Sequence, residues 1–154
     1  MKPTNAIATH RFGAAVKYCA VILLSILATS SAAFASLGQD SEKIEDAYGA
    51  IVERRLRDDE TVSVLYKQDR YLYLVIFAND RSVSETYFHV KGTDFSEKEI
   101  TRFLKANAAG ATWTPDNTAE ERRFKRSDRK AEATYGKVKG RPALTVRELR
   151  GGKP

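Results

Sequence analysis

The chain has 154 residues, of which 42% are hydrophobic, and a formal net charge of +6. Three of its 26 basic residues and none of its 20 acidic residues fall within residues 1–35, so the remainder carries 23 − 20 = +3. This small excess argues against nucleic acid as a partner. The single cysteine, Cys19, excludes an intrachain disulfide and a cysteine-ligated zinc site.

Residues 1–35 have the three parts of a secretory signal peptide. Residues 1–17 are basic without any acidic residue, residues 20–28 are apolar, and Ala33-Phe34-Ala35 supplies the small residues that signal peptidase requires. We predict cleavage after Ala35, a periplasmic or secreted bacterial protein, and membrane contact only before cleavage. The alternative is an uncleaved anchor, because the uncharged residues 18–38 are about long enough to cross a bilayer.

Cleavage would leave 154 − 35 = 119 residues, a length typical of one domain. We predict a single domain over residues 36–150, a flexible tail over residues 151–154, and a monomer in solution. No cysteine remains in this part of the chain, and His89 is its only histidine. For an exported protein, the absence of disulfides favours the periplasm over a small disulfide-stapled secreted scaffold.

The first half of the domain predicts one helix and four strands. The helix begins at Asp40 or Ser41, either of which can cap it, and ends at Tyr48. Strands joined by short polar turns are predicted over residues 51–57, 61–67, 71–77 and 82–90. Residues 71–77 are apolar on both faces, so we predict a central strand that is covered on each side.

The second half begins with the clearest local signal in the chain. Ser96 and Glu99 form a Ser-x-x-Glu capping box, an apolar stripe follows, and Gly110 is expected to end the helix. Residues 114–118 predict a loop, and strands are predicted over residues 121–126, 130–135 and 143–149. The predicted fold is α+β, with two short helices packed on an antiparallel meander sheet in the order helix, strands, helix, strands. This order is typical of a diverged internal duplication, although no residue-level repeat supports one.

The opening of the domain contains a short recurring pattern, made of Leu37-Gly38, Ile44, Tyr48-Gly49, Tyr66 and Val75-Ile76-Phe77. In this pattern, residues 37–90 resemble the SmpA/OmlA family of outer-membrane assembly lipoproteins, which are related in shape to the beta-lactamase-inhibitor-protein fold. The resemblance implies a short helix that leads into an antiparallel meander, and a role in envelope interactions. The chain departs from the pattern at Ala50, where the family usually has proline, and in lacking the lipid-bearing cysteine.

Candidates for catalysis and metal binding are few. His89 is the only candidate general base near neutral pH, but no triad spacing or nucleophile elbow accompanies it, so we expect a surface histidine. Two acidic clusters, residues 58–60 and Asp116 with Glu120 and Glu121, lack the order of a calcium loop. We therefore predict no catalytic residue, metal or cofactor.

Two groups of residues are candidates for partner binding. The tyrosines of residues 71–87 are core if a helix covers their face of the sheet, and a recognition surface if none does. The basic residues between 122 and 130 either hold an anionic polymer or protect an exposed edge strand. The candidate partner-binding residues are Tyr71, Tyr73, Tyr87, Arg122, Arg123, Lys125 and Arg126.

We therefore expect a non-enzymatic module of the cell envelope that binds a protein partner or an anionic polymer. This expectation rests on predicted export, small size, and a sequence without a recognised nucleophile, metal or phosphate motif. The alternative is a small periplasmic hydrolase that depends on carboxylates, or a small-ligand binder. An enzyme should contain a pocket with perturbed carboxylates, whereas a binding module should present a broad sheet face or an exposed edge.

Overall fold

The computed structural model describes residues 37–116 and 121–149. These residues belong to one compact unit, Ala32–Pro154. The predicted signal peptide over residues 1–35, the predicted tail over residues 151–154, and Glu120 lie outside the described residues. Within the described part, no helix is both long enough and apolar enough to cross a membrane.

The described residues confirm the predicted α+β class, with two helices and eight strands. The first half consists of α2 (Ser41–Tyr48), β1 (Ala50–Leu56), β2 (Val62–Gln68), β3 (Tyr71–Ala78) and β4 (Arg81–His89). The second half consists of α3 (Glu97–Ala106), β5 (Trp113–Asp116), β6 (Arg122–Arg126), β7 (Ala131–Val138) and β8 (Arg141–Glu148). The strands form one antiparallel sheet in the order β1-β2-β3-β4-β8-β7-β6-β5.

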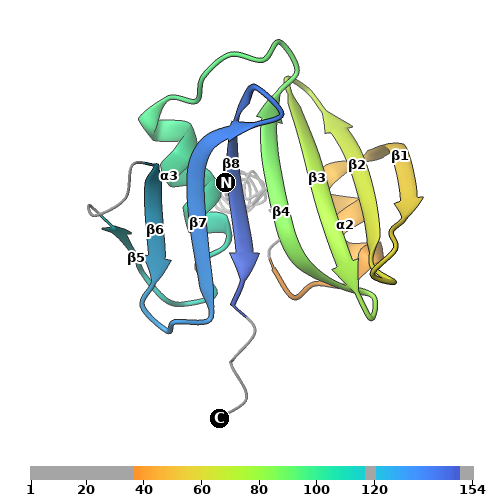
Figure 1. Cartoon of the computed structure of the whole chain (residues 1–154), viewed down its shortest axis with the longest axis horizontal. Coiled ribbons are helices and arrows are strands. Elements are labelled where there is room, and N and C mark those ends of the chain that lie inside the picture. The colour runs from red at the N-terminus through yellow and green to blue at the C-terminus, as the bar shows by residue number, and fades with distance from the viewer. Residues whose placement is uncertain (1–36, 117–120, 150–154) are drawn as a thin grey trace, which may run out of the picture. The chain divides into compact units, whose positions relative to one another are not determined.

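The two halves share one order of elements, a helix followed by four strands that pair in sequence. They meet at their last strands, because β4 pairs with β8 and places Thr86 opposite Thr145. Figure 1 shows both helices on the same side of the sheet, behind the strands in that view. The topology therefore has an approximate twofold character, in which β1 to β4 correspond to β5 to β8.

Strand β5 corrects the prediction of a loop over residues 114–118 for residues 114–116, while residues 117 and 118 lie outside the described residues. It pairs with β6 at the edge of the sheet, where Pro115 lies opposite Phe124. Proline cannot donate a hydrogen bond to a neighbouring strand, but an edge strand leaves one side of its backbone unpaired. The edge position therefore accommodates a residue that, in the sequence, is typical of a loop.

Local capping residues fix the helix ends. Asp40 caps α2 by accepting a hydrogen bond from a backbone N–H of the first turn at 3.0 Å. At the start of α3, Ser96 and Glu99 form the predicted capping box. This helix ends at its cap residue Asn107, earlier than the predicted end at Gly110, and the connecting residues up to β5 are irregular.

The core lies between the helices and one face of the sheet, which we call the helix face. Tyr48 of α2 stacks on Tyr73 with 4.1 Å between ring centroids, and Phe103 of α3 stacks on Tyr87 at 4.3 Å. The exposed fractions of Tyr71, Tyr73 and Tyr87 are 5%, 4% and 1%. These three tyrosines are therefore core residues, and they do not form a surface that a partner could contact.

Candidate functional site: the open face of the sheet

The opposite face of the sheet, which we call the open face, is not covered by either described helix (Figure 1). Because side chains alternate along a strand, Leu72 and Leu74 of β3 point to this face while Tyr71 and Tyr73 point to the core. In the first half of the domain this face is apolar, and its central residues are Leu65, Leu72, Leu74, Ile76 and Phe88. They line a hollow of about 660 Å³, which we call the apolar hollow.

This arrangement corrects the prediction that residues 71–77 form a strand covered on each side. The strand is central and apolar on both faces, as predicted, but the described residues cover only its helix face. Leu72, Leu74 and Ile76 remain partly exposed. A contiguous apolar patch left open on a domain surface commonly marks an interaction site. The sequence does contain a signal for this site, because the second face of β3 is apolar. That signal predicts a buried face, whereas the face is open among the described residues.

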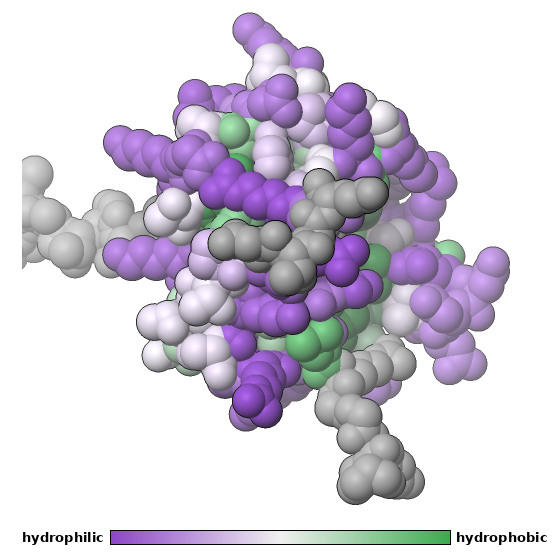
Figure 2. Space-filling view, turned by 60° about the vertical axis from the view of Figure 1, so that its left-hand side comes forward, coloured by the Kyte–Doolittle hydropathy of each residue, from purple (hydrophilic) through white to green (hydrophobic). Residues whose placement is uncertain are grey.

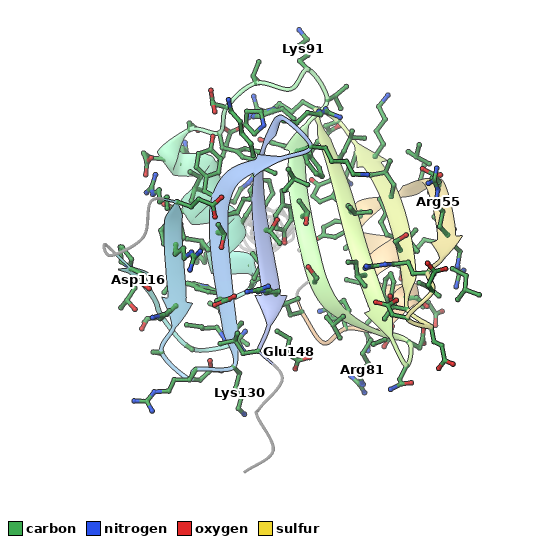
Figure 3. The ribbon with its side chains drawn as sticks, in the orientation of Figure 1. Arg55, Arg81, Lys91, Asp116, Lys130 and Glu148 are labelled. Atoms are coloured by element: carbon green, nitrogen blue, oxygen red, sulfur yellow. The ribbon has the colours of Figure 1, made fainter. Side chains whose placement is uncertain are left out.

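On the β1 side of the apolar hollow, the positive charges of the rim are balanced by acidic side chains. Arg55, which Figure 3 labels at the β1 edge of the sheet, forms an ion pair with Glu53 on the same strand. Arg57 lies 3.7 Å from a carboxylate oxygen of Asp59. Such exposed pairs stabilise the fold only slightly. Their consequence for the surface is that this rim is close to neutral.

The rim on the opposite side, at the turn between β7 and β8, is positive. Lys139 lies in this turn with a φ of 50°, in the left-handed backbone conformation that tight hairpin turns require. Arg141 begins β8, donates a hydrogen bond to the backbone carbonyl of His89 at 2.8 Å, and lies over the Phe88 ring at 5.5 Å from its centroid. Within the described ranges, neither Lys139 nor Arg141 has a carboxylate partner.

The open face of the second half is polar. The row of cross-strand partners that contains Leu65 and Leu74 continues through Thr86, Thr145, Thr134 and Arg123. The hydroxyls of Thr86 and Thr145 lie 3.1 Å apart. Arg147 forms an ion pair with Glu132 across β8 and β7. The open face therefore has an apolar half and a polar half, divided near the junction of β4 and β8.

The predicted basic segment on β6 does not form a single basic surface. Arg122 and Arg126 turn toward α3, where Arg122 pairs with Glu97 and Arg126 is only 8% exposed. Arg123 and Lys125 turn toward the open face, and Lys125 lies 2.9 Å from a β5 carboxylate. Figure 2 shows this side of the molecule, where hydrophilic side chains cover most of the surface. The alternation of the strand therefore splits the four cations between two faces.

A buried polar cluster joins the two halves on the helix face. Glu85 of β4 is 1% exposed and accepts hydrogen bonds from the hydroxyls of Tyr48, at 2.7 Å, and Tyr87. Asn107, the cap of α3, donates to the Tyr87 hydroxyl at 2.7 Å. Burial raises the pKa of Glu85 above its ordinary value, and the hydroxyl hydrogen bonds only partly oppose this. Because Glu85 lines none of the hollows described here, the cluster connects helices and is not placed to meet a substrate.

A second carboxylate, Glu99, ties α3 to the ends of β3 and β4. Its oxygens accept hydrogen bonds from the Tyr71 hydroxyl at 2.6 Å and from the Ser96 backbone at 2.8 Å, and His89 Nε2 lies 3.3 Å away. Burial alone would raise the pKa of Glu99, but the hydrogen bonds from Tyr71 and Ser96 outweigh it and lower the pKa to about 2. His89, expected at the surface, is 8% exposed and packs against the rings of the core residues Tyr71 and Phe95. Its contacts are those of a structural residue.

In the acidic turn at residues 58–60, the Asp59 carboxylate finds its hydrogen-bond donors immediately next to the turn. The Asp59 carboxylate accepts a hydrogen bond from the Thr61 backbone N–H at 3.2 Å, and hydrogen bonds from Thr61 lower the pKa of Asp59. Of the second predicted cluster, Asp116 pairs with Lys125. In residues 37–116 and 121–149, no group of three His, Cys, Asp or Glu side chains is arranged to hold a metal ion.

A further hollow of about 450 Å³ lies beside α3 and is lined by Leu104, Trp113 and Phe124 among others. Trp113 is partly buried and packs against the core. Sequence analysis did not identify this hollow, because its lining residues come from α3, β5 and β6. Its lining also includes Pro115 and Arg122, and we assign no site to it.

Comparison with known proteins gives little independent support. No family model matches the chain, and no curated protein matches it. Among solved structures, one match is a cysteine-rich secretory protein from Staphylococcus aureus, with 9% sequence identity and a TM-score of 0.43. The match covers 73% of this chain and 44% of that one, so this chain spans less than half of the other protein's length. The resemblance to the SmpA/OmlA family stays a prediction, and the function must be argued from the surface itself.

Proposed function

We propose that the protein is a non-enzymatic module of the cell envelope that binds another protein through the apolar half of its open face. The observation that carries this proposal is the apolar hollow over β2, β3 and β4, which the described helices leave uncovered. Its floor is contiguous, and apolar contact between complementary surfaces is the main driving force of protein association. The predicted signal peptide supports a location in the cell envelope for this proposal.

The polar half of the same face makes an anionic polymer a weaker candidate. Its arginines and lysine are largely paired with acids, as in the pairs Arg147 with Glu132 and Lys125 with Asp116. A polymer-binding surface needs uncompensated cations in a continuous track. Lys139 and Arg141 are among the cations that have no acidic partner within the described residues, and they border the apolar hollow instead. Charge therefore supplements an apolar contact here.

The experiment compares one charge placed at two equivalent positions of the open face. Leu74→Asp puts a carboxylate into the apolar hollow, and Thr134→Asp puts one at the corresponding position of β7 in the polar half. The protein without residues 1–35 is used to capture partners from an envelope extract, after thermal melts show that both variants fold. We expect Leu74→Asp to lose partners that the unmodified protein and Thr134→Asp retain.

Equal capture by a folded Leu74→Asp variant would contradict the proposal, since a buried carboxylate in the hollow cannot be tolerated at an apolar interface. Loss of capture with Thr134→Asp alone would move the binding site to the polar half. Turnover of an envelope substrate that disappears with Glu85→Gln or His89→Gln, in a folded variant, would favour the alternative of an enzyme.

A further inference from the structure

The dimensions of the apolar hollow restrict what can occupy it. Leu72, Leu74 and Ile76 are alternate residues of one strand, so the floor extends about 13 Å along β3. Leu65 and Phe88 lie on the neighbouring strands, which makes the floor about 10 Å wide. An enclosed pocket buries most of a small ligand, whereas this floor is broad and open to one side. Its width matches an α-helix, whose diameter with side chains is about 10–12 Å.

The charge around the hollow is asymmetric. The lining residues include four cations, Arg55, Arg57, Lys139 and Arg141, and one acid, Glu53. The cations of the β1 rim are paired with Glu53 and Asp59, but those of the β7–β8 rim have only backbone and ring contacts among the described residues. A complementary occupant would therefore carry acidic groups on one of its two sides.

The protein's own terminal segments outside the described ranges do not fit this requirement. Residues 1–36 contain three basic residues and no acidic one, and residues 150–154 contain Arg150 and Lys153 and no acid. Either segment would be repelled by the positive rim. The acidic helix α2 of a second copy does not fit either, because its apolar residues Ile44 and Tyr48 are 0% and 2% exposed in its own core.

We propose that the apolar hollow binds an amphipathic α-helix of a partner protein, with an acidic row of residues facing Lys139 and Arg141. This inference rests on the proposed function and specifies the chemistry of the partner. A floor of about 13 Å accommodates about nine residues of helix, or two to three turns. The apolar stripe of the helix packs on Leu65, Leu74 and Ile76. The acidic row replaces the missing carboxylate partners of the β7–β8 rim.

The test uses two synthetic peptides of about 18 residues, long enough to form a helix on binding. Both carry one leucine stripe, and they differ in having glutamate or lysine along one flank. Binding is measured by titration followed by NMR, with the methyl groups of Leu65, Leu72, Leu74 and Ile76 as reporters. We expect the glutamate peptide to bind at least about tenfold more tightly than the lysine peptide. Its affinity should fall as salt is raised.

Charge reversal provides the matched control. The pair Lys139→Glu with Arg141→Glu should invert the preference toward the lysine peptide, and Lys139→Glu alone should reduce the preference while retaining the contacts of Arg141. Arg123→Glu, on the polar half of the open face, should leave the preference unchanged. If the double variant does not fold, Lys139→Glu alone decides the outcome.

Each result separates this inference from the proposed function. If both peptides shift the methyl signals with equal affinity, the inference of an acidic helix is overturned, and the open face remains a binding site. No binding of either peptide, together with partner capture that Leu74→Asp abolishes, would also overturn it and favour a non-helical partner. Shifts of the same methyls with phosphatidylglycerol vesicles but with neither peptide would reassign the hollow to an anionic lipid.

Discussion

Equivalent positions on the open face carry opposite chemistry in the two halves of the sheet. Leu74 on β3 corresponds to Thr134 on β7, and Leu65 on β2 corresponds to Arg123 on β6. On the helix face both halves contribute buried apolar residues to one core, although the buried Glu85 of β4 lies opposite the apolar Val146 of β8. Packing against the helices constrains the helix face in both halves, whereas nothing in the fold requires the open face to be apolar in either. This contrast supports the proposal that a partner protein covers the apolar half.

The first test of this comparison contrasts one residue from each face. Phe103 is 0% exposed and its ring contacts those of Tyr71, Tyr73 and Tyr87, so Phe103→Ala should lower the free energy of unfolding by about 3–5 kcal/mol. Leu74→Ala on the open face should cost only about 1 kcal/mol, because the side chain is already partly exposed. Urea denaturation measures both. Equal costs would mean that the open face is packed as tightly as the core.

The second test concerns Glu99, which holds α3 against the sheet. Its lowered pKa means that its contribution to stability is present above the ordinary value of 4.5 and is lost as the pH falls toward about 2. Glu99→Gln should cost about 1–3 kcal/mol at pH 7, and the difference from the unmodified protein should shrink in acid. Glu97→Gln, in an exposed pair on the same helix, should lower the stability much less. A pH-independent cost for Glu99→Gln would contradict this role.

The third test uses Glu85, whose pKa is shifted in the opposite direction. The folded state holds the proton of Glu85 more tightly than the unfolded state, so unfolding becomes easier as the pH rises from the ordinary value of 4.5 through the raised pKa. Glu85→Gln should remove this dependence and gain stability relative to the unmodified protein over the same interval. Denaturation at several pH values checks it. A parallel pH profile for the variant would show that Glu85 is already ionised in the fold.

The elements with strong local signals were predictable from the sequence. Ser96 and Glu99 form the predicted capping box because both partners lie within one turn of helix. The strand at residues 71–77 was predicted to be central, and it is. Strand β5 was missed because Pro115 and Asp116 are typical of loops, and only the edge position makes a strand of them.

The candidate site was harder to predict, for a physical reason. Alternation along residues 71–77 separates a tyrosine face from a leucine face, but it does not say which face the helices cover. The sequence left Tyr71 and Tyr73 open between core and recognition surface; they are buried, and the hollow is lined by Leu72 and Leu74, which were not among the candidates. The choice depends on where α2 and α3 pack, and that is fixed by contacts distant in the sequence, such as Tyr48 with Tyr73.

The most direct test makes the apolar half resemble the polar half. The double variant Leu65→Arg with Leu74→Thr gives β2 and β3 the residues that β6 and β7 carry at the corresponding positions. Partner capture and thermal melting are then measured together on the unmodified protein and the variant. The account predicts that capture is lost while the variant still melts cooperatively as a folded domain. Undiminished capture by the folded variant would contradict the claim that the apolar hollow is the binding site.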